Sequence, residues 1–245
     1  MPTTRIWPIV AADVQPTVAS SALLPGSVRT AMDLDHALVT TRAVRRRLDL
    51  ERPVPRAVVL ECLQLALQAP NGSNTQPWRW VIVDDPAQRA AAAAIYRAAI
   101  DDVASRPGPR LADSSSPAGQ RLAASVAHLK DNLHRVPVLV VPVVRGRLDA
   151  EPLFMQASRW GSILPAVWSF MLALRARGLG SAWTTIHIRR ERQMAELLGI
   201  PNDEWTQAGL FPVAYTIGTE FRPAERGRAE DVVSWNRWSG EDRSG

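Results

Sequence analysis

The stretch from Gln68 to Val83, QAPNGSNTQPWRWVIV, decides the fold of this chain. Its last part, Trp80–Val83, is an aromatic and β-branched run of the kind that forms buried strands. Its middle part, Pro70–Thr75, is rich in turn-forming residues. Ahead of it, apolar pairs recur every four residues, the period of a buried helix face: Val58/Val59, Cys62/Leu63 and Ala66/Leu67. The pattern predicts a helix, a polar loop and a buried strand in succession.

The loop at Pro70–Thr75 offers several amide and hydroxyl groups from one place, and none of them titrates near neutrality. Such a set suits recognition of a flat ring with polar edges better than it suits proton transfer. The alternative is an ordinary connection in which Asn71 and Gly72 supply turn geometry. Spacing alone favours this plainer interpretation.

Composition predicts one soluble domain. The chain has 245 residues, of which 46% are hydrophobic, enough for a single full core. Arg and Pro interrupt every apolar run before it reaches membrane-spanning length, and the first residues lack a secretory signal. The single cysteine, Cys62, lies on the apolar helix face and is expected in the core. We therefore expect a reduced, cytoplasmic protein with no membrane partner.

The net charge of +5 and the pI near 10.5 raise the question of nucleic-acid binding. Lys130 is the only lysine, and the arginines are scattered among alanines and acids along the whole chain. There is no zinc-finger spacing and no recognition-helix signature, and the four histidines lack metal-ligand spacing. The sequence therefore predicts neither a nucleic-acid partner nor a metal site.

Three further segments accompany the loop. They are Thr41–Arg47 (TRAVRRR), the run from Gly161–Ala166 to Leu179–Trp183, and Arg226–Val233. In this order and at these separations, the four segments resemble the nitroreductase family of FMN-dependent oxidoreductases, over roughly residues 32–238. The resemblance implies an α+β fold of three layers, with a mixed central sheet flanked by helices, in an intertwined homodimer.

The same resemblance implies a single nitroreductase-like domain over residues 32–245, ending in a C-terminal arm. Residues 1–31 precede it and lack sustained periodicity. They are interpreted as a flexible extension, a segment that embraces a partner, or sequence upstream of the true start. We expect the following further elements: helices at 33–39, 56–69, 86–100, 120–133, 158–177 and 191–198, strands at 136–144, 182–188 and 209–218, and a mobile loop at 106–119.

The resemblance also implies a set of FMN-binding residues. The arginine segment would hold the phosphate and ribityl chain, the polar loop would lie beside the ribityl chain and ring, and residues after the Gly178–Gly180 turn would approach the ring. A basic residue near the C-terminus, preferably Arg226, would close on the phosphate. The full set is Arg42, Ala43, Val44, Arg45, Arg46, Pro70, Asn71, Gly72, Asn74, Gln76, Thr185, Ile186, Arg226 and Arg228.

One departure from the family pattern affects the phosphate site. The family commonly has R-R-S where this chain has Thr41-Arg42-Ala43, so one arginine and one hydroxyl are replaced. FMN affinity would be weaker, unless Arg46 compensates. The alternative for the whole run is a solvated basic segment, which accounts for most such runs.

The implied activity is reduction of a nitroaromatic, a quinone or a similar planar acceptor by NAD(P)H, through ping-pong hydride transfer at flavin N5. No catalytic side chain is required, and the sequence shows no acid–base constellation. Gly178-Leu179-Gly180 is not a dinucleotide fingerprint, because it follows a helix and Trp183 occupies the third glycine position. The alternatives are a flavin storage or sequestration protein with little turnover, and a specialised family member that performs flavin fragmentation or reductive dehalogenation.

A dimer is also predicted from the residues themselves. The helix expected at Ser158–Arg177 is apolar around most of its circumference, which indicates burial in the core or across a subunit interface. The polar tail carries Trp235 and Trp238, which need a surface on which to dock. Together they give more apolar surface than a lone domain tolerates.

Overall fold

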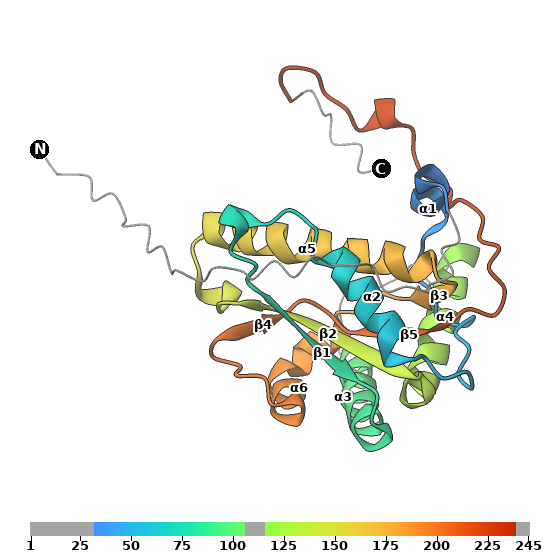
Figure 1. Cartoon of the computed structure of the whole chain (residues 1–245). Coiled ribbons are helices and arrows are strands. Elements are labelled where there is room, and N and C mark those ends of the chain that lie inside the picture. The colour runs from blue at the N-terminus through green and yellow to red at the C-terminus, as the bar shows by residue number, and fades with distance from the viewer. Residues whose placement is uncertain (1–31, 106–115, 239–245) are drawn as a thin grey trace, which may run out of the picture.

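The computed structural model describes residues 32–105 and 116–238. The N-terminal extension and most of the expected loop at 106–119 therefore lie outside the described residues. Figure 1 shows two layers of helices with a sheet between them. The elements are α1 (Leu34–Thr40), α2 (Arg56–Ala66), β1 (Trp78–Val83), α3 (Pro86–Ala104), α4 (Pro117–Asn132), β2 (Val138–Arg145), α5 (Leu153–Arg175), β3 (Leu179–Ser181), α6 (Glu191–Leu198), β4 (Trp205–Gln207) and β5 (Phe211–Tyr215).

Local sequence signals fix several helix boundaries. The Asp33 carboxylate accepts a hydrogen bond from the backbone N–H of His36 (3.1 Å), which caps α1. Asp85 caps α3 in the same way, with Pro86 in the first turn. Gly199, at φ +67°, ends α6 in the left-handed conformation that glycine adopts without strain. The expected helices at 33–39, 86–100 and 191–198 are confirmed for this reason.

β2 is the central strand, as its continuous apolar sequence predicts. Seven of its eight residues are buried. Val138, Val140 and Val144 pack with α2 and α5, whereas Leu139, Val141 and Val143 pack with α3, α4 and α6. Because successive side chains of a strand point to opposite faces, this alternation places a core on each side of the sheet.

The expected mixed sheet is wrong for the described residues, where every strand pairing is antiparallel. The strand order is β1-β2-β5-β3, and β4 pairs with β2 beyond the end of β5. β1 and β2 are antiparallel because two helices, α3 and α4, connect them rather than a single crossover helix. β2 and β3, which one helix connects, do run parallel, but β5 lies between them.

Pro142 lies in the middle of the central strand, whereas we expected it at a strand end or edge. Along one edge of β2 the pairing passes from β5 to β4, and Pro142 falls at the break between them. Its carbonyl accepts from the N–H of Ala208 (2.9 Å), so its nitrogen faces the same break. The missing N–H therefore removes no ladder hydrogen bond.

Other boundaries also differ from expectation. The strand expected at 182–188 is earlier and shorter, as β3, and residues Ile186–Arg190 form a 3₁₀ helix. Gly180 lies inside β3 rather than in the turn, and glycine allows close packing there, since a Cβ at this position would lie 2.7 Å from Thr216 Cγ2. The strand expected at 209–218 is β5 alone, and β4 was not predicted. α2 ends before residue 69, α4 begins before residue 120, and α5 begins before residue 158.

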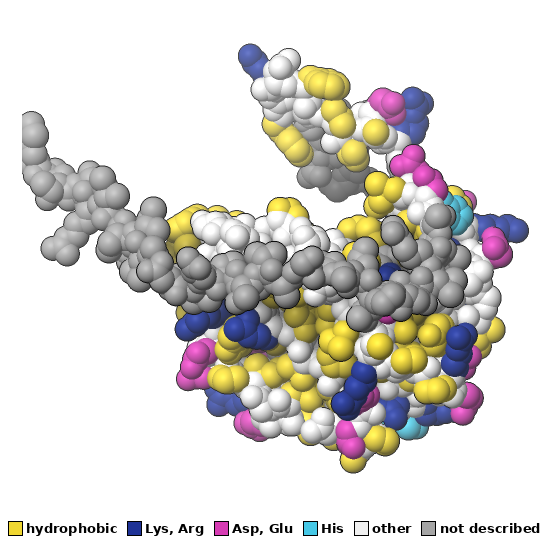
Figure 2. Space-filling model, viewed as in Figure 1, with side chains coloured by type: hydrophobic (Ala, Val, Ile, Leu, Met, Phe, Trp, Pro, Cys, Tyr) yellow, Lys and Arg dark blue, Asp and Glu magenta, His cyan; other side chains and the backbone are white. Residues whose placement is uncertain are grey.

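Within one chain, α5 is buried along one side only, so the prediction that it is buried in the core or across a subunit interface stays a prediction. One side packs on α2 and the sheet, through Ile163, Val167 and Phe170. Near its start Leu153 and Phe154 are exposed, and Trp168 is exposed further along. Figure 2 shows hydrophobic side chains on the projecting C-terminal arm as well as on the body. Within the described residues, no helix is long and apolar enough to cross a membrane.

Candidate functional site

The arginine segment lies against the end of β3. The N–H of Val44 donates to the carbonyl of Ser181 (2.8 Å), and the Val44 side chain is buried against Gly180. This contact fixes the backbone between Arg42 and Arg45 while both of their side chains remain partly accessible. The structure thus brings the segment predicted from its sequence to one edge of the sheet.

Four buried polar atoms around this contact have no hydrogen-bond partner: Thr41 Oγ1, Arg42 Nε, Arg45 Nε and Ser181 Oγ. Neither Arg42 nor Arg45 forms an ion pair within the described residues. Buried polar groups are normally satisfied, so each of these atoms needs a partner from outside this part of the chain. The donors and charge fit an anionic group such as a phosphate, which guanidinium groups bind through charge-assisted hydrogen bonds.

The remaining arginines of the segment are not equivalent. Arg47 donates from Nε to the carbonyl of Ile217 (2.8 Å) and from Nη1 to that of Glu220 (2.8 Å), and its guanidinium lies over the Phe221 ring. Its role is structural, because it anchors the turn that leads into the C-terminal arm. Arg46 is exposed.

The polar loop at residues 70–76 is held in an unusual backbone conformation. Ser73 (φ +51°), Asn74 (+52°) and Gln76 (+46°) all have positive φ, which costs residues other than glycine about 1 kcal/mol or more each. The Asn71 side chain accepts from the N–H of Gln76 (2.8 Å) and thus braces the loop. The side chains of Asn74 and Gln76 are exposed. Such strain persists only where the surroundings impose it, and it is concentrated at binding sites.

The N-terminal half of α5 imposes this conformation. The N–H of Gly72 donates to Ser162 Oγ (2.9 Å), and a Cβ on Gly72 would lie 2.7 Å from Ser158 Oγ. Glycine at this position is therefore required for the close approach of the loop to the helix. Ser158 and Ser162 were not among the predicted site residues. Their spacing of four on one helix face was the signal available in the sequence.

The polar loop and the arginine segment lie at opposite ends of α5 (Figure 1). The loop contacts Ser162, whereas the segment from Thr40 to Val44 shares a pocket with Met171 and Arg175. Ser162 and Arg175 are 13 positions apart, or about 20 Å along the helix axis. Two segments expected to contact the same ribityl chain are therefore far apart within one chain.

The other predicted residues lie in two places, beside the arginine segment and on the C-terminal arm. Ile186 packs in the same apolar cluster as Val44, and Thr185 is the exposed residue before it, so both lie on the side of the arginine segment. Arg226 and Arg228 are on the C-terminal arm, where Arg228 Nε pairs with Glu230 (3.3 Å). In Figure 1 this arm projects away from the body. The structure does not bring either of these arginines to Arg42 in one chain.

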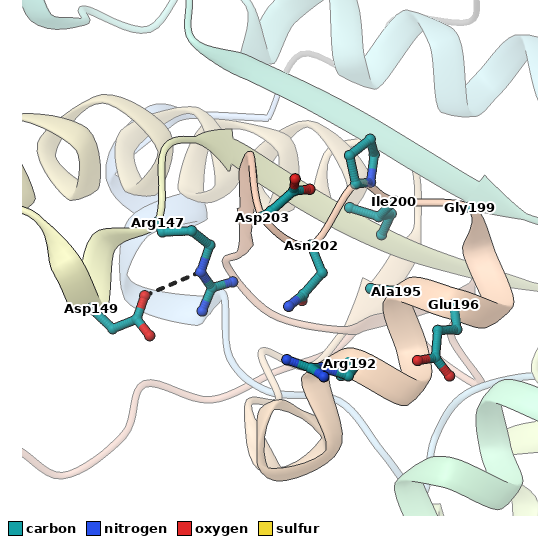
Figure 3. Close-up of a pocket in the computed structure, with 10 residues that line it drawn as sticks. Arg147, Asp149, Arg192, Ala195, Glu196, Gly199, Ile200, Asn202 and Asp203 are labelled. Carbon is teal, nitrogen blue, oxygen red and sulfur yellow. Dashed lines mark hydrogen bonds and ion pairs between the residues drawn. The ribbon is translucent and has the colours of Figure 1, made fainter.

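A separate open pocket, of about 690 Å³, lies beside α6 and contains none of the predicted residues (Figure 3). Arg147 donates to Asp149 (3.1 Å) and to Glu191 (3.0 Å), and the hydrogen bond from Arg147 lowers the pKa of Asp149. The charged side chains of the lining are two arginines and three acids: Arg147, Arg192, Asp149, Glu196 and Asp203. A lining with more acidic than basic side chains suits a phosphate poorly, so we do not assign the cofactor here.

Comparison with known proteins agrees with the geometry. The model of the nitroreductase family matches residues 38–215. A relative from Thermus thermophilus, an NADH dehydrogenase, is 32% identical over 218 residues, which cover 83% of this chain and 96% of the relative. The chain belongs to the nitroreductase family.

Two solved structures share the fold of this chain. Iodotyrosine deiodinase, in a crystal structure bound to FMN and 3-iodo-L-tyrosine, has a TM-score of 0.64 and 24% identity, and the match covers 84% of this chain and 100% of that one. The FMN- and NADPH-dependent nitroreductase from sphigopyxis sp. strain HMH has a TM-score of 0.62 and 20% identity, with the same coverage. The α+β architecture expected from the sequence is therefore confirmed.

Proposed function

We propose that this nitroreductase family member is an FMN-dependent oxidoreductase that uses NAD(P)H to reduce a nitroaromatic, a quinone or a similar planar acceptor. The observation that carries the proposal is the pair Arg42 and Arg45, each with a buried Nε that lacks a partner in the described chain. Burying a guanidinium N–H without a hydrogen-bond acceptor costs free energy. An anionic group at this strand end would supply the acceptor for both arginines.

In this proposal Arg42 and Arg45 hold the phosphate and ribityl chain, with Ala43, Val44 and Arg46 lining the same stretch. When bound, FMN supplies the two-electron chemistry, and the protein supplies binding, orientation and electrostatics. The strained loop presents Asn74 and Gln76 as polar groups for the ring and ribityl chain. Thr185 and Ile186 approach the ring from the end of β3. This division of labour requires no general base.

We further propose a homodimer whose two cofactor sites each draw on both subunits. Because the loop at residues 70–76 lies about 20 Å along α5 from the arginine segment, one chain cannot bring both to the same ribityl chain. A second copy would supply the missing half of each site. The exposed Phe154 and Trp168 of α5 are the apolar surface through which two copies would meet.

The same arrangement gives the donor and the acceptor one binding slot. If two binding segments enclose the phosphate and one ring face, only one ring face stays open, and NAD(P)H and the acceptor use it in turn. Steady-state kinetics with both substrates varied should give parallel double-reciprocal lines. Intersecting lines would place donor and acceptor in separate pockets.

The first experiment is the absorption spectrum of the purified protein, in which oxidised flavin should be visible. NAD(P)H oxidation is then measured with and without a planar acceptor. Bound FMN without turnover would support a storage or sequestration protein instead. Turnover restricted to dehalogenation or flavin breakdown would identify a specialised member. Absence of flavin, together with no binding of added FMN, would refute the proposal.

The domain assignment belongs to the same proposal. We infer that residues 32–245 act as a single unit in the cytoplasm, with the C-terminal arm reaching the partner subunit. Trp235 (83% exposed) and Trp238 (86%) have no surface to cover them within the described chain. Arg226 and Arg228 lie on this arm, so docking of the arm would also decide which phosphate they reach.

A further inference from the structure

Where α5 ends, the chain forms a small and mostly enclosed pocket beside the arginine segment. Its volume is about 10 Å³, and its lining includes Thr41, Arg42, Arg175, Ser181 and Phe221. This volume matches a single water molecule or a single oxygen atom of a larger ligand. The pocket therefore has room for one polar atom and for nothing larger.

Arg175 is the unexpected member of this lining. It is only 6% exposed, although it carries a permanent positive charge. Nη2 donates to the carbonyl of Thr219 (2.9 Å), with Thr40 Oγ1 at 3.5 Å, and Nε has no partner. Arg175 forms no ion pair with a carboxylate in the described ranges. A buried charge that forms no ion pair is unfavourable, so the fold retains it at a cost.

Charged groups of both signs lie near Arg175. Burial lowers the pKa of Arg175, nearby Glu220 opposes this effect, and Arg47 adds to it. Both guanidinium groups lie over the Phe221 ring, with Arg175 Cζ 4.7 Å and Arg47 Cζ 4.1 Å from the ring centroid. Stacking and the bond to Thr219 hold the guanidinium in place, with its free Nε in the pocket lining.

Unpartnered donors from separate chain segments line this pocket. Besides Arg175 Nε they are Arg42 Nε, Thr41 Oγ1 and Ser181 Oγ. Two guanidinium groups and two hydroxyl groups around a space for one atom are suited to an oxygen that carries negative charge. A terminal phosphate carries up to two negative charges, so it can be matched by two guanidinium groups.

We propose that Arg175 is a further cationic group for the terminal phosphate of the cofactor, placed by α5 where Thr41 replaces an arginine of the family pattern. This inference rests on the proposed function, because it needs FMN as the ligand. Arg175, which lies 134 positions from Thr41 in the sequence, would then replace the missing positive charge at position 41, rather than the exposed Arg46.

The test compares the affinities of the apoprotein for FMN and for riboflavin, which lacks the phosphate, by quenching of flavin fluorescence. Arg175→Gln removes the charge but keeps an N–H donor for the Thr219 carbonyl. We expect its FMN affinity to fall about tenfold or more, as for loss of one charge-assisted contact, while its riboflavin affinity changes less than about twofold. Arg175→Lys, which keeps the charge, should retain most of the preference for FMN.

The matched control is Arg177→Gln, since Arg177 pairs with Glu61 (3.3 Å) and does not line the pocket. Its FMN-to-riboflavin ratio should equal that of the unmodified protein. An unchanged ratio in Arg175→Gln, or equal losses of both flavins, overturns the assignment of Arg175 but leaves the proposed function standing. Binding of neither flavin by the unmodified protein overturns both.

A second variant applies if circular dichroism shows that Arg175→Gln is unfolded. Phe221→Leu removes the ring that holds Arg175 and leaves the charge in place. Its FMN affinity should fall, and its riboflavin affinity should not. If Phe221→Leu keeps the FMN-to-riboflavin ratio of the unmodified protein, the assignment of Arg175 to the phosphate is wrong.

Discussion

The two sides of the sheet differ in how completely one chain covers them. On the side of α3, α4 and α6, Leu122 is the one large hydrophobic residue of these helices that is exposed in the described chain. On the side of α1, α2 and α5, and on the C-terminal arm, there are many more. They are Leu34, Leu38, Val39, Leu60, Leu65, Leu153, Phe154, Trp168, Val232, Val233, Trp235 and Trp238.

The difference indicates which side of the sheet one chain covers by itself and which side would need a second copy to cover it. The side of α3, α4 and α6 has a buried core, and its helices expose only one large hydrophobic side chain in the described chain. The α5 side also has a buried core, but its outer surface exposes many large apolar side chains to water, which is unfavourable. The proposed cofactor residues lie at the two ends of this second surface, which is why assembly and flavin binding should fail together.

The largest expected effect is the double substitution Phe154→Glu and Trp168→Glu on the outer surface of α5. Phe154 is 72% exposed in one chain, so a carboxylate there costs little in the monomer but a great deal in a dimer interface. We expect a monomeric mass by light scattering and loss of bound flavin. The matched control, Leu122→Glu on α4, should keep both the dimeric mass and the flavin. A dimer that survives the double substitution would place the interface elsewhere.

A second prediction concerns the side of α3, α4 and α6, where His187 is fully buried. Burial lowers the pKa of His187 from 6.5 to about 4, with Gln207 opposing the shift. The folded protein therefore binds fewer protons than the unfolded chain between these two values. Its contribution to stability is fully present above pH 6.5 and is lost as pH falls towards 4, by roughly 3 kcal/mol in all.

Urea titrations at several pH values between 7 and 4 would measure this loss. His187→Leu should flatten the dependence in that window, whereas the exposed His134→Gln should leave it unchanged. Asp84 and Asp149, whose pKa values are lowered by Arg56 and Arg147, contribute mainly below this window. A slope that persists in His187→Leu would assign the pH dependence to other groups.

A third prediction concerns the edge between the two sides, where Arg42 lies. Arg42→Ala removes a charge-assisted contact worth about 1.5–3 kcal/mol, so FMN affinity should fall at least tenfold. Arg56→Ala is a suitable control, because Arg56 is an exposed arginine that pairs with Asp84. Equal flavin content in Arg42→Ala and in the unmodified protein would remove Arg42 from the site.

The smallest effect is expected at Cys62, in the inner core of the α5 side. Cys62 has no exposed surface, and burial raises the pKa of its thiol to about 12. A thiol reagent should therefore not label the native protein at neutral pH, but should label it fully in denaturant. Rapid labelling of the native protein would show that the inner core on this side is as incomplete as its outer surface.

Much of the fold was accessible from the sequence because its signals are local. The caps at Asp33 and Asp85, the apolar run of β2 and the glycine stop after α6 each depend on a few neighbouring residues. The arginine segment and the polar loop are also visible as local patterns, and their role towards a cofactor stays a prediction. Pro142 was misplaced because its position depends on where two other strands meet, and no local pattern encodes that.

The sequence by itself determined most of the helices, the central strand, the family pattern and the residue types of the proposed site. Tertiary structure alone decided which of these residues meet. α5 separates the polar loop from the arginine segment by its own length, and it carries Arg175 to the pocket beside Arg42. The reason is physical. A helix holds residues at its two ends at a fixed distance of tens of ångströms, whereas a sequence pattern describes only neighbours within a few residues.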